Sequence, residues 1–150
     1  MLKRVTRLLP VVQMAEDTER EAAAKLASLQ QKLTQAQTQL QGLEQYRADY
    51  QQQLVTQGQS GVSGDWLMNY QRFLSQLETA IKQQHQSIDW HQQHVDSARE
   101  QWQKAYTRLE GLRRLIENYR QQAQLQLSKA EQKDMDEIAQ RLGTIRQRLK

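Results

Sequence analysis

The sequence predicts an all-α fold: a long antiparallel two-helix coiled coil, or hairpin, with a protruding C-terminal helix. Strong helix formers dominate, with 29 glutamines alone, while one proline and six glycines leave few places where a helix must stop. Apolar residues recur at alternating spacings of three and four along two segments. Only 37% of the residues are hydrophobic, which is enough for one stripe per helix and too little for a globular core.

The first predicted helix covers about residues 11–56, and its heptad seam extends further toward the N-terminus. The seam is broken only at Glu19 and Arg47. Its apolar positions are Val5, Leu8, Val12, Ala15, Ala22, Leu26, Leu29, Leu33, Ala36, Leu40, Leu43, Tyr50 and Leu54.

Glycine and serine residues then predict a loop over about residues 57–65, with Asp65 as the N-cap of the second helix. That helix covers about residues 66–149, and its seam is interrupted by Gln84 and His91. The apolar positions are Leu67, Tyr70, Leu74, Leu77, Ile81, Ile88, Val95, Ala98, Trp102, Ala105, Leu109, Leu112, Ile116, Tyr119 and Ala123. The phase of the repeat changes beyond Ala130, so we expect a bend or fraying near residues 128–133. A short loop between two stripes favours one coiled-coil domain over residues 1–150.

The unequal lengths of the two helices are the main functional signal. Folding about a loop centre near Gly61 places Leu43 beside Thr79 and Val12 opposite Glu110, so the second helix has no partner from about residue 123 onward. The stripe left over contains Leu127, Met135, Ile138, Leu142, Ile145 and Leu149. An isolated amphipathic helix is only marginally stable in water, so this segment either frays, docks on another protein, or pairs with its own copy.

Neither catalysis nor a cofactor is expected. A two-helix rod offers no enclosed site that would shift the pKa of a carboxylate. The loop glycines are not followed by the Gly-Lys-Ser/Thr of a phosphate loop, which argues against a nucleotide or another small-molecule substrate. His91 and His94 are three residues apart on a helix, but no carboxylate or cysteine completes a metal site, so no metal is expected.

The net charge of +4 permits contact with nucleic acid. We nevertheless expect no nucleic-acid partner, because the arginines between residues 108 and 120 alternate with Glu110 and Glu117 and lack aromatic stacking partners. A basic nucleic-acid-binding hairpin is therefore a weak alternative. No run approaches the roughly 18 apolar residues of a membrane span, and Thr6, Arg7 and Pro10 interrupt the apolar N-terminus. These features, with the absence of cysteine, predict a cytoplasmic protein.

Several surface residues have two interpretations. Arg141, Arg146, Arg148 and Lys150 either solubilise the helix end or form a docking surface for an acidic partner. Trp90 lies off the seam, where it either anchors a partner or covers neighbouring apolar surface. Tyr46 and Phe73 flank the seam and can broaden the packed stripe.

Three segments resemble the FliJ family of flagellar export proteins, and the likeness spans nearly the whole chain. The first two flank the loop, and the third is a Lys-Asp-Met-Asp-Glu segment near the end. Their residues are Gln39, Leu40, Leu43, Tyr46, Tyr50 and Leu54; Asn69, Tyr70, Gln71, Arg72, Phe73, Leu74, Leu77, Glu78, Ala80 and Ile81; and Lys133, Asp134, Met135, Asp136, Glu137, Ala139, Gln140 and Arg141. One position departs, because Gln84 stands where relatives can have histidine.

This resemblance implies a soluble, non-enzymatic component of the bacterial flagellar type III export apparatus, similar in fold to the coiled-coil stalk of a rotary ATPase. It implies that the end with both termini sits in the hexameric export ATPase, that the loop end contacts the export-gate membrane protein, and that escort chaperones also bind. The location would be cytoplasmic, with peripheral association at the inner membrane. The gate-contact positions carried over are Gln39, Leu43, Tyr46, Tyr50, Phe73, Leu77 and Ala80. For the ATPase contact we expect Met135, Ile138, Arg141, Leu142, Ile145, Arg146 and Leu149.

The main alternative is an unrelated cytoplasmic coiled-coil scaffold or adaptor, which would share the fold and nothing more. It would present the same seams and the same leftover stripe. Failure to bind an export ATPase would favour this alternative.

Overall fold

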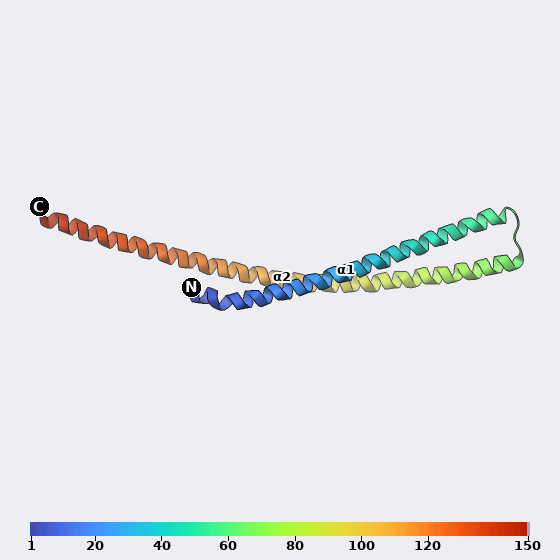
Figure 1. Ribbon diagram of the computed structural model, residues 1–150, viewed down its shortest axis with the longest axis horizontal. Coiled ribbons are helices and arrows are strands. Elements are labelled where there is room, and N and C mark those ends of the chain that lie inside the picture. Colours follow the sequence, from blue (N-terminus) through green and yellow to red (C-terminus); the bar gives the residue numbers. More distant parts are fainter. Residues whose placement is uncertain (150) are drawn as a thin grey trace. The chain divides into compact units, whose positions relative to one another are not determined.

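A computed structural model describes residues 1–149 and confirms the all-α fold. Helix α1 spans Leu2–Gly58 with 57 residues, and helix α2 spans Gly64–Leu149 with 86 residues; the described chain has no strand (Figure 1). A rise of 1.5 Å per residue makes these helices about 85 Å and 130 Å long. Lys150, part of the predicted basic run, lies outside the described residues.

The first helix begins at Leu2, so the predicted start near residue 11 is wrong. The reason is that the seam continues through Val5, which is only 6% exposed. Burial of this side chain favours helix upstream of Pro10, although a proline nitrogen has no hydrogen to donate to the carbonyl four residues earlier.

The loop is shorter than predicted, and its cap is a different residue. It contains residues 59–63, where Gly61 adopts a φ of 82°, a conformation that favours glycine. The backbone N–H of Trp66 donates to the Ser63 hydroxyl oxygen at 3.1 Å, so Ser63 is the N-cap and Asp65 lies in the first turn. A carboxylate in the first turn still favours the helix, because it faces the positive end of the helix dipole.

Helix α2 continues through residues 128–133 without interruption, so the expected fraying there is wrong. Every residue from 124 to 149 is exposed. The change of phase in the apolar pattern therefore disturbs no packing against another helix. The backbone hydrogen bonds of α2 continue through this segment.

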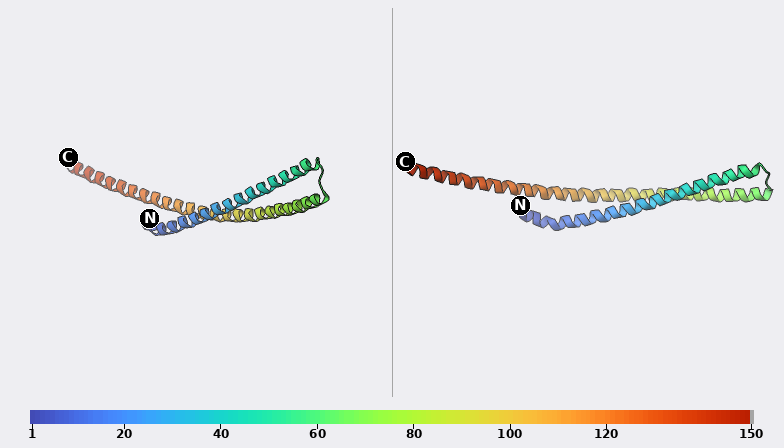
Figure 2. Two further views of the ribbon diagram at one scale, coloured as in Figure 1. Left: turned by 45° about the vertical axis from the view of Figure 1, so that its right-hand side comes forward. Right: turned by 45° about the horizontal axis from the view of Figure 1, so that its top comes forward.

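The chain divides into two packed units, one of residues 21–103 and one of residues 1–20 with 104–150. In the first unit α1 and α2 run antiparallel on either side of the loop (Figures 1 and 2). A single seam is buried between them, with Val95 only 2% exposed. Its buried side chains are Leu33, Ala36, Tyr70, Leu77, Ile81, Val95 and Ala98.

A polar residue marks the register of this unit. The Gln84 side-chain amide donates to the Ala36 carbonyl oxygen at 2.8 Å and to the Gln39 side-chain oxygen at 3.2 Å. A polar residue at a seam position lowers the stability of a coiled coil. It lowers the stability of other registers further, because in those registers the polar group has no hydrogen-bond partner. These contacts therefore favour the loop-centred pairing that the sequence predicts.

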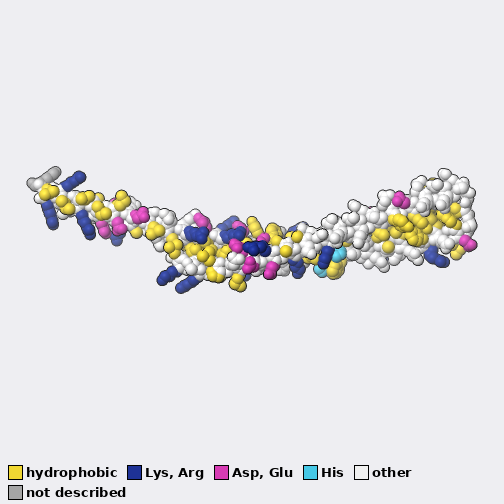
Figure 3. Space-filling model, in the orientation of Figure 1, with side chains coloured by type: hydrophobic (Ala, Val, Ile, Leu, Met, Phe, Trp, Pro, Cys, Tyr) yellow, Lys and Arg dark blue, Asp and Glu magenta, His cyan; other side chains and the backbone are white. Residues whose placement is uncertain are grey.

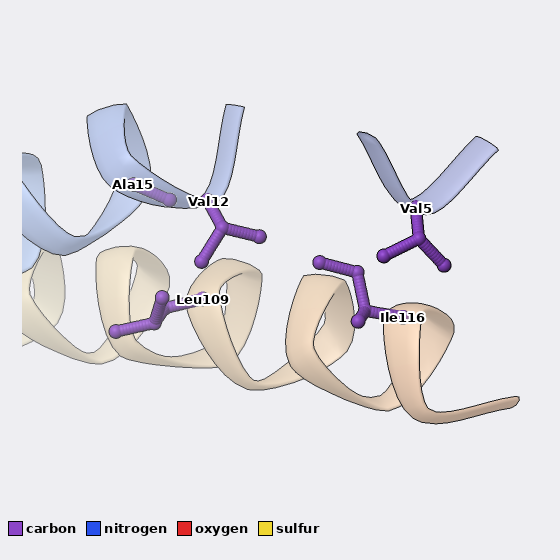
Figure 4. Packing of buried hydrophobic residues seen from close by; sticks show 5 residues of the cluster. All are labelled: Val5, Val12, Ala15, Leu109 and Ile116. Atoms are coloured by element: carbon purple, nitrogen blue, oxygen red, sulfur yellow. The ribbon is translucent and has the colours of Figure 1, made fainter. Parts of the chain in front are cut away.

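The second unit packs the start of α1 on the middle of α2 (Figure 4). Val5, Val12 and Ala15 of α1 form one buried cluster with Leu109 and Ile116 of α2. Leu8, Leu112 and Tyr119 pack against it. The Arg113 guanidinium links the two helices of this unit, at 3.4 Å from the Glu16 carboxylate of α1 and 3.0 Å from the Glu110 carboxylate of α2.

The predicted seams agree closely with the observed burial. Up to residue 123, every predicted seam position is buried or half-buried apart from Leu67, which is 38% exposed beside the loop. Within residues 1–149, neither helix contains a stretch apolar enough to span a membrane.

Leu109→Ala should lower the free energy of unfolding by about 2–4 kcal/mol, because it deletes buried methyl groups from the cluster. Leu125→Ala on the same helix should change it by less than about 0.5 kcal/mol, because Leu125 is 60% exposed. Urea unfolding followed by circular dichroism measures both. Equal losses for the two variants would contradict the seam.

Candidate partner-binding surfaces

Five aromatic rings gather near the loop, on both helices, and we call them the aromatic cluster: Trp66, Tyr70, Tyr50, Tyr46 and Phe73. Tyr50 and Tyr70 stack across the two helices, with ring centroids 4.6 Å apart and an interplanar angle of 4°. Trp66 stacks on Tyr70 at 5.4 Å, and Phe73 lies 4.7 Å from Tyr50. Tyr46 extends the cluster, with its ring centroid 5.8 Å from that of Phe73.

Seam position decides how far each ring is buried. Tyr70 occupies a seam position and is 4% exposed, whereas Tyr46 and Phe73 flank the seam and are 51% and 36% exposed. The cluster therefore has a packed inner side and a solvent-facing edge. Aromatic rings at such an edge supply a large contact area for a partner at low entropic cost.

The pKa of the Tyr70 hydroxyl is perturbed by its position in the cluster. Burial raises the pKa of its hydroxyl above the ordinary value of 10.0, and the nearby Tyr50 adds to the rise. The hydroxyl oxygen has no hydrogen-bond partner among the described residues. Both observations identify Tyr70 as a packing residue whose polar end is poorly accommodated.

The positions that the sequence assigns to a gate contact divide into two groups. Leu77 is buried, and Leu43, Tyr50 and Ala80 are half-buried, so these side chains pack between the helices. Gln39, Tyr46 and Phe73 are exposed, although Gln39 also accepts the hydrogen bond from Gln84. The exposed group therefore offers the largest surface to another protein, whereas Leu77 is covered by the hairpin itself.

The sequence reasoning missed four exposed apolar side chains beside the loop. Val55 is 56% exposed and Met68 is 61% exposed, with Val62 and Leu67 close to 40%. Three of them lie off the seam, and an apolar residue off the seam next to a loop was the available signal. Together with the exposed edge of the aromatic cluster, they add hydrophobic side chains to a largely polar loop end (Figure 3).

The second candidate surface is residues 124–149 of α2, which we call the tail. Each predicted ATPase-contact residue in it is exposed, with Ile145 at 52% and Leu149 at 82%. A space-filling view shows apolar side chains along the tail with acidic and basic side chains beside them (Figure 3). Met1, Leu2 and Lys3 line one hollow with Ala123, Gln126 and Leu127, so the helix lacks a partner from residue 128 to 149 and not from residue 123.

A third exposed feature surrounds Trp90 in the middle of α2. Its ring is 55% exposed and lies 4.0 Å from the ring of His94, whose Nδ1 is 2.8 Å from the Trp90 carbonyl oxygen. His91 is half-buried at its seam position. Within residues 1–149, no three histidine, cysteine or acidic side chains lie close enough together to hold a metal ion.

The family model described as the flagellar FliJ protein matches residues 3–148. This chain belongs to the FliJ family. Two relatives agree with the assignment. A flagellar FliJ protein of Escherichia coli strain K12 is 34% identical over 128 residues, and one of Salmonella typhi is 33% identical over 128 residues. Each alignment covers 85% of this chain and 87% of the relative.

FliJ-family membership selects among the functions that the sequence left open. It contradicts the alternative of an unrelated scaffold, because the match covers nearly the whole chain and not one heptad segment. It places the chain among flagellar proteins and agrees with an export role. The described residues of this FliJ-family chain show two exposed apolar surfaces, one beside the loop and one along the tail.

Stability should fall as the pH rises above about 10, because burial raises the pKa of Tyr70 in the folded state only. Below that pH both states keep the proton, so this contribution is fully present there. Tyr70→Phe should remove this part of the pH dependence and at pH 7 should be neutral or stabilising by about 1 kcal/mol, because it deletes an unpaired buried hydroxyl.

Thermal unfolding across the alkaline range and an ultraviolet titration of the tyrosines measure both effects. Tyr46→Phe is the matched control, since it removes a tyrosine hydroxyl from a ring of the same cluster that is 51% exposed. A late-titrating tyrosine that persists in Tyr70→Phe would contradict the assignment.

Proposed function

We propose that this chain is a non-enzymatic stalk of flagellar protein export that bridges the export ATPase ring and the export-gate membrane protein and also binds escort chaperones. Membership of the FliJ family supports the coarser part, a component of flagellar export. The single observation that carries the finer part is the exposed tail, because an apolar stripe left uncovered along a helix marks a surface that binds a partner.

The tail has the chemistry of a segment that inserts into a ring or groove. Its stripe repeats at helical spacing, which is how an amphipathic helix engages an apolar groove. Arg141, Arg146 and Arg148 lie along the same turns and complement an acidic rim. We therefore assign the ATPase contact to the tail.

The gate contact is assigned to the exposed edge of the aromatic cluster. Tyr46 and Phe73 come from different helices, and their rings meet edge to face at 5.8 Å, so the fold of the hairpin holds them in one orientation. A rigid pair loses little entropy on binding. Leu77, which is buried, acts by holding the two helices together beneath this edge.

The proposed location follows from these two contacts. A chain that binds an ATPase ring and a membrane-embedded gate works in the cytoplasm and is associated peripherally with the inner membrane. Its mostly polar surface offers further room for escort chaperones. No small-molecule substrate or nucleic acid forms part of the proposal.

Ile138→Asp combined with Leu142→Asp should weaken binding to the hexameric export ATPase by at least about tenfold, because it places charge in the middle of the stripe. Isothermal titration calorimetry with the purified ATPase measures the affinity. Met68→Asp is the matched control, since Met68 is exposed on the same helix beside the loop. Unchanged affinity in a double variant that keeps its helicity would reject the tail as the contact.

Tyr46→Ala combined with Phe73→Ala should reduce affinity for the cytoplasmic part of the export gate by about tenfold or more, and swimming motility should fall with it. Trp90→Ala removes an aromatic ring of similar exposure elsewhere on α2 and should leave both readouts unchanged. Circular dichroism establishes that the hairpin stays folded. Normal gate binding by the folded double variant would show that the contact lies elsewhere.

A further inference from the structure

The charges of the tail are divided between its two halves, and the proposed function does not explain this division. Residues 129–137 carry four acidic side chains together with Lys129 and Lys133, whereas every charged side chain in residues 138–149 is basic (Figure 3). The acidic residues are Glu131, Asp134, Asp136 and Glu137, and the basic ones are Arg141, Arg146 and Arg148. No ion pair within residues 1–149 involves any of these side chains.

The stripe between these charges has the spacing of a coiled-coil seam. Its side chains follow one another at intervals of three, four, three and four residues, and each is more than half exposed. They are Met135, Ile138, Leu142, Ile145 and Leu149. A heptad seam of this kind is complementary to another helix that bears the same repeat.

We propose that two copies of this chain pair through their tails as an antiparallel two-helix coiled coil. The occupant of the stripe is thus a second copy of the same tail. The contact is isologous, since a two-fold axis relates the two helices and each contributes the same residues. In this register Met135 packs beside Ile145 of the second copy, and Ile138 beside Leu142.

Charge complementarity selects the antiparallel orientation. Asp134 and Arg148 flank the seam on the same side, and antiparallel pairing brings each Asp134 opposite Arg148 of the second copy, which gives two attractive pairs. Only Arg141 then faces its own counterpart, near the two-fold axis. A parallel pair would instead set Arg141 against Arg146 twice and leave Asp134 opposite Ala139.

Pairing of this kind would cover the stripe whenever the tail is free. The inference goes beyond the proposed function, because it requires no ATPase and would hold even if the stripe never entered one. An interface of about two turns on either side of the axis is small, so the dimer is weak and its population depends on protein concentration.

Sedimentation equilibrium of the full chain over a range of concentrations tests the pairing. A reversible monomer–dimer equilibrium is expected, with Leu142→Asp monomeric and Arg148→Glu raising the dimer Kd at least about tenfold, since two attractive pairs become repulsive. The swap of Asp134→Arg with Arg148→Asp should restore the dimer. Arg114→Glu, an equal charge change at an exposed position of α2 outside the tail, should have no effect.

Two results would overturn the pairing: a monomer at every concentration, or a dimer that survives Leu142→Asp. Orientation is tested separately, because the chain has no cysteine of its own. A mixture of Met135→Cys and Ile145→Cys chains should form a disulfide between the two variants under mild oxidation. A disulfide within the Met135→Cys sample alone would overturn the antiparallel orientation, since that register separates the two cysteines by about 15 Å along the axis.

Discussion

The structure depends on one constraint: each helix has a single apolar stripe and can bury it only against another helix. Neither described unit has a second layer of structure. Val95 and Leu109, at 2% and 3% exposed, are among the few side chains that lose nearly all contact with water. Stability is therefore spread along the seam in increments of about 1.5–3 kcal/mol per buried side chain, and register matters at every layer.

Register in turn creates the surface near the loop. Tyr50 and Tyr70 stack only because the pairing about the loop sets them opposite each other, and Tyr46 and Phe73 meet as a result. Gln84 supports the same pairing through its hydrogen bond to the Ala36 carbonyl oxygen. Residues on the seam therefore hold the two helices together, and the residues beside it face solvent.

The exposure of the tail has the same cause, because no second helix is there to cover its apolar stripe. From residue 128 to residue 149 the second helix packs against no other described part of the chain, so its stripe stays in water and contributes little to the free energy of the hairpin. The same segment is helical throughout, which suits a surface that must meet a partner with its side chains already in order. The charge distribution of the tail and the heptad spacing of its apolar stripe are compatible with two partners, an acidic protein and a second copy of the tail.

The sequence by itself determined the all-α class, both seams, the loop and the excess length of α2. The physical reason is that the spacing of the apolar residues along a helix identifies the face that is buried. It also carried the family resemblance in the residues around the loop and in the Lys-Asp-Met-Asp-Glu segment. Only the tertiary structure decided that α1 begins at Leu2, that Ser63 caps α2, and that the rings of Tyr46 and Phe73 meet edge to face. The physical reason is that periodicity assigns a face, whereas burial, capping and ring contacts depend on which atoms of the opposite helix or turn arrive beside each side chain.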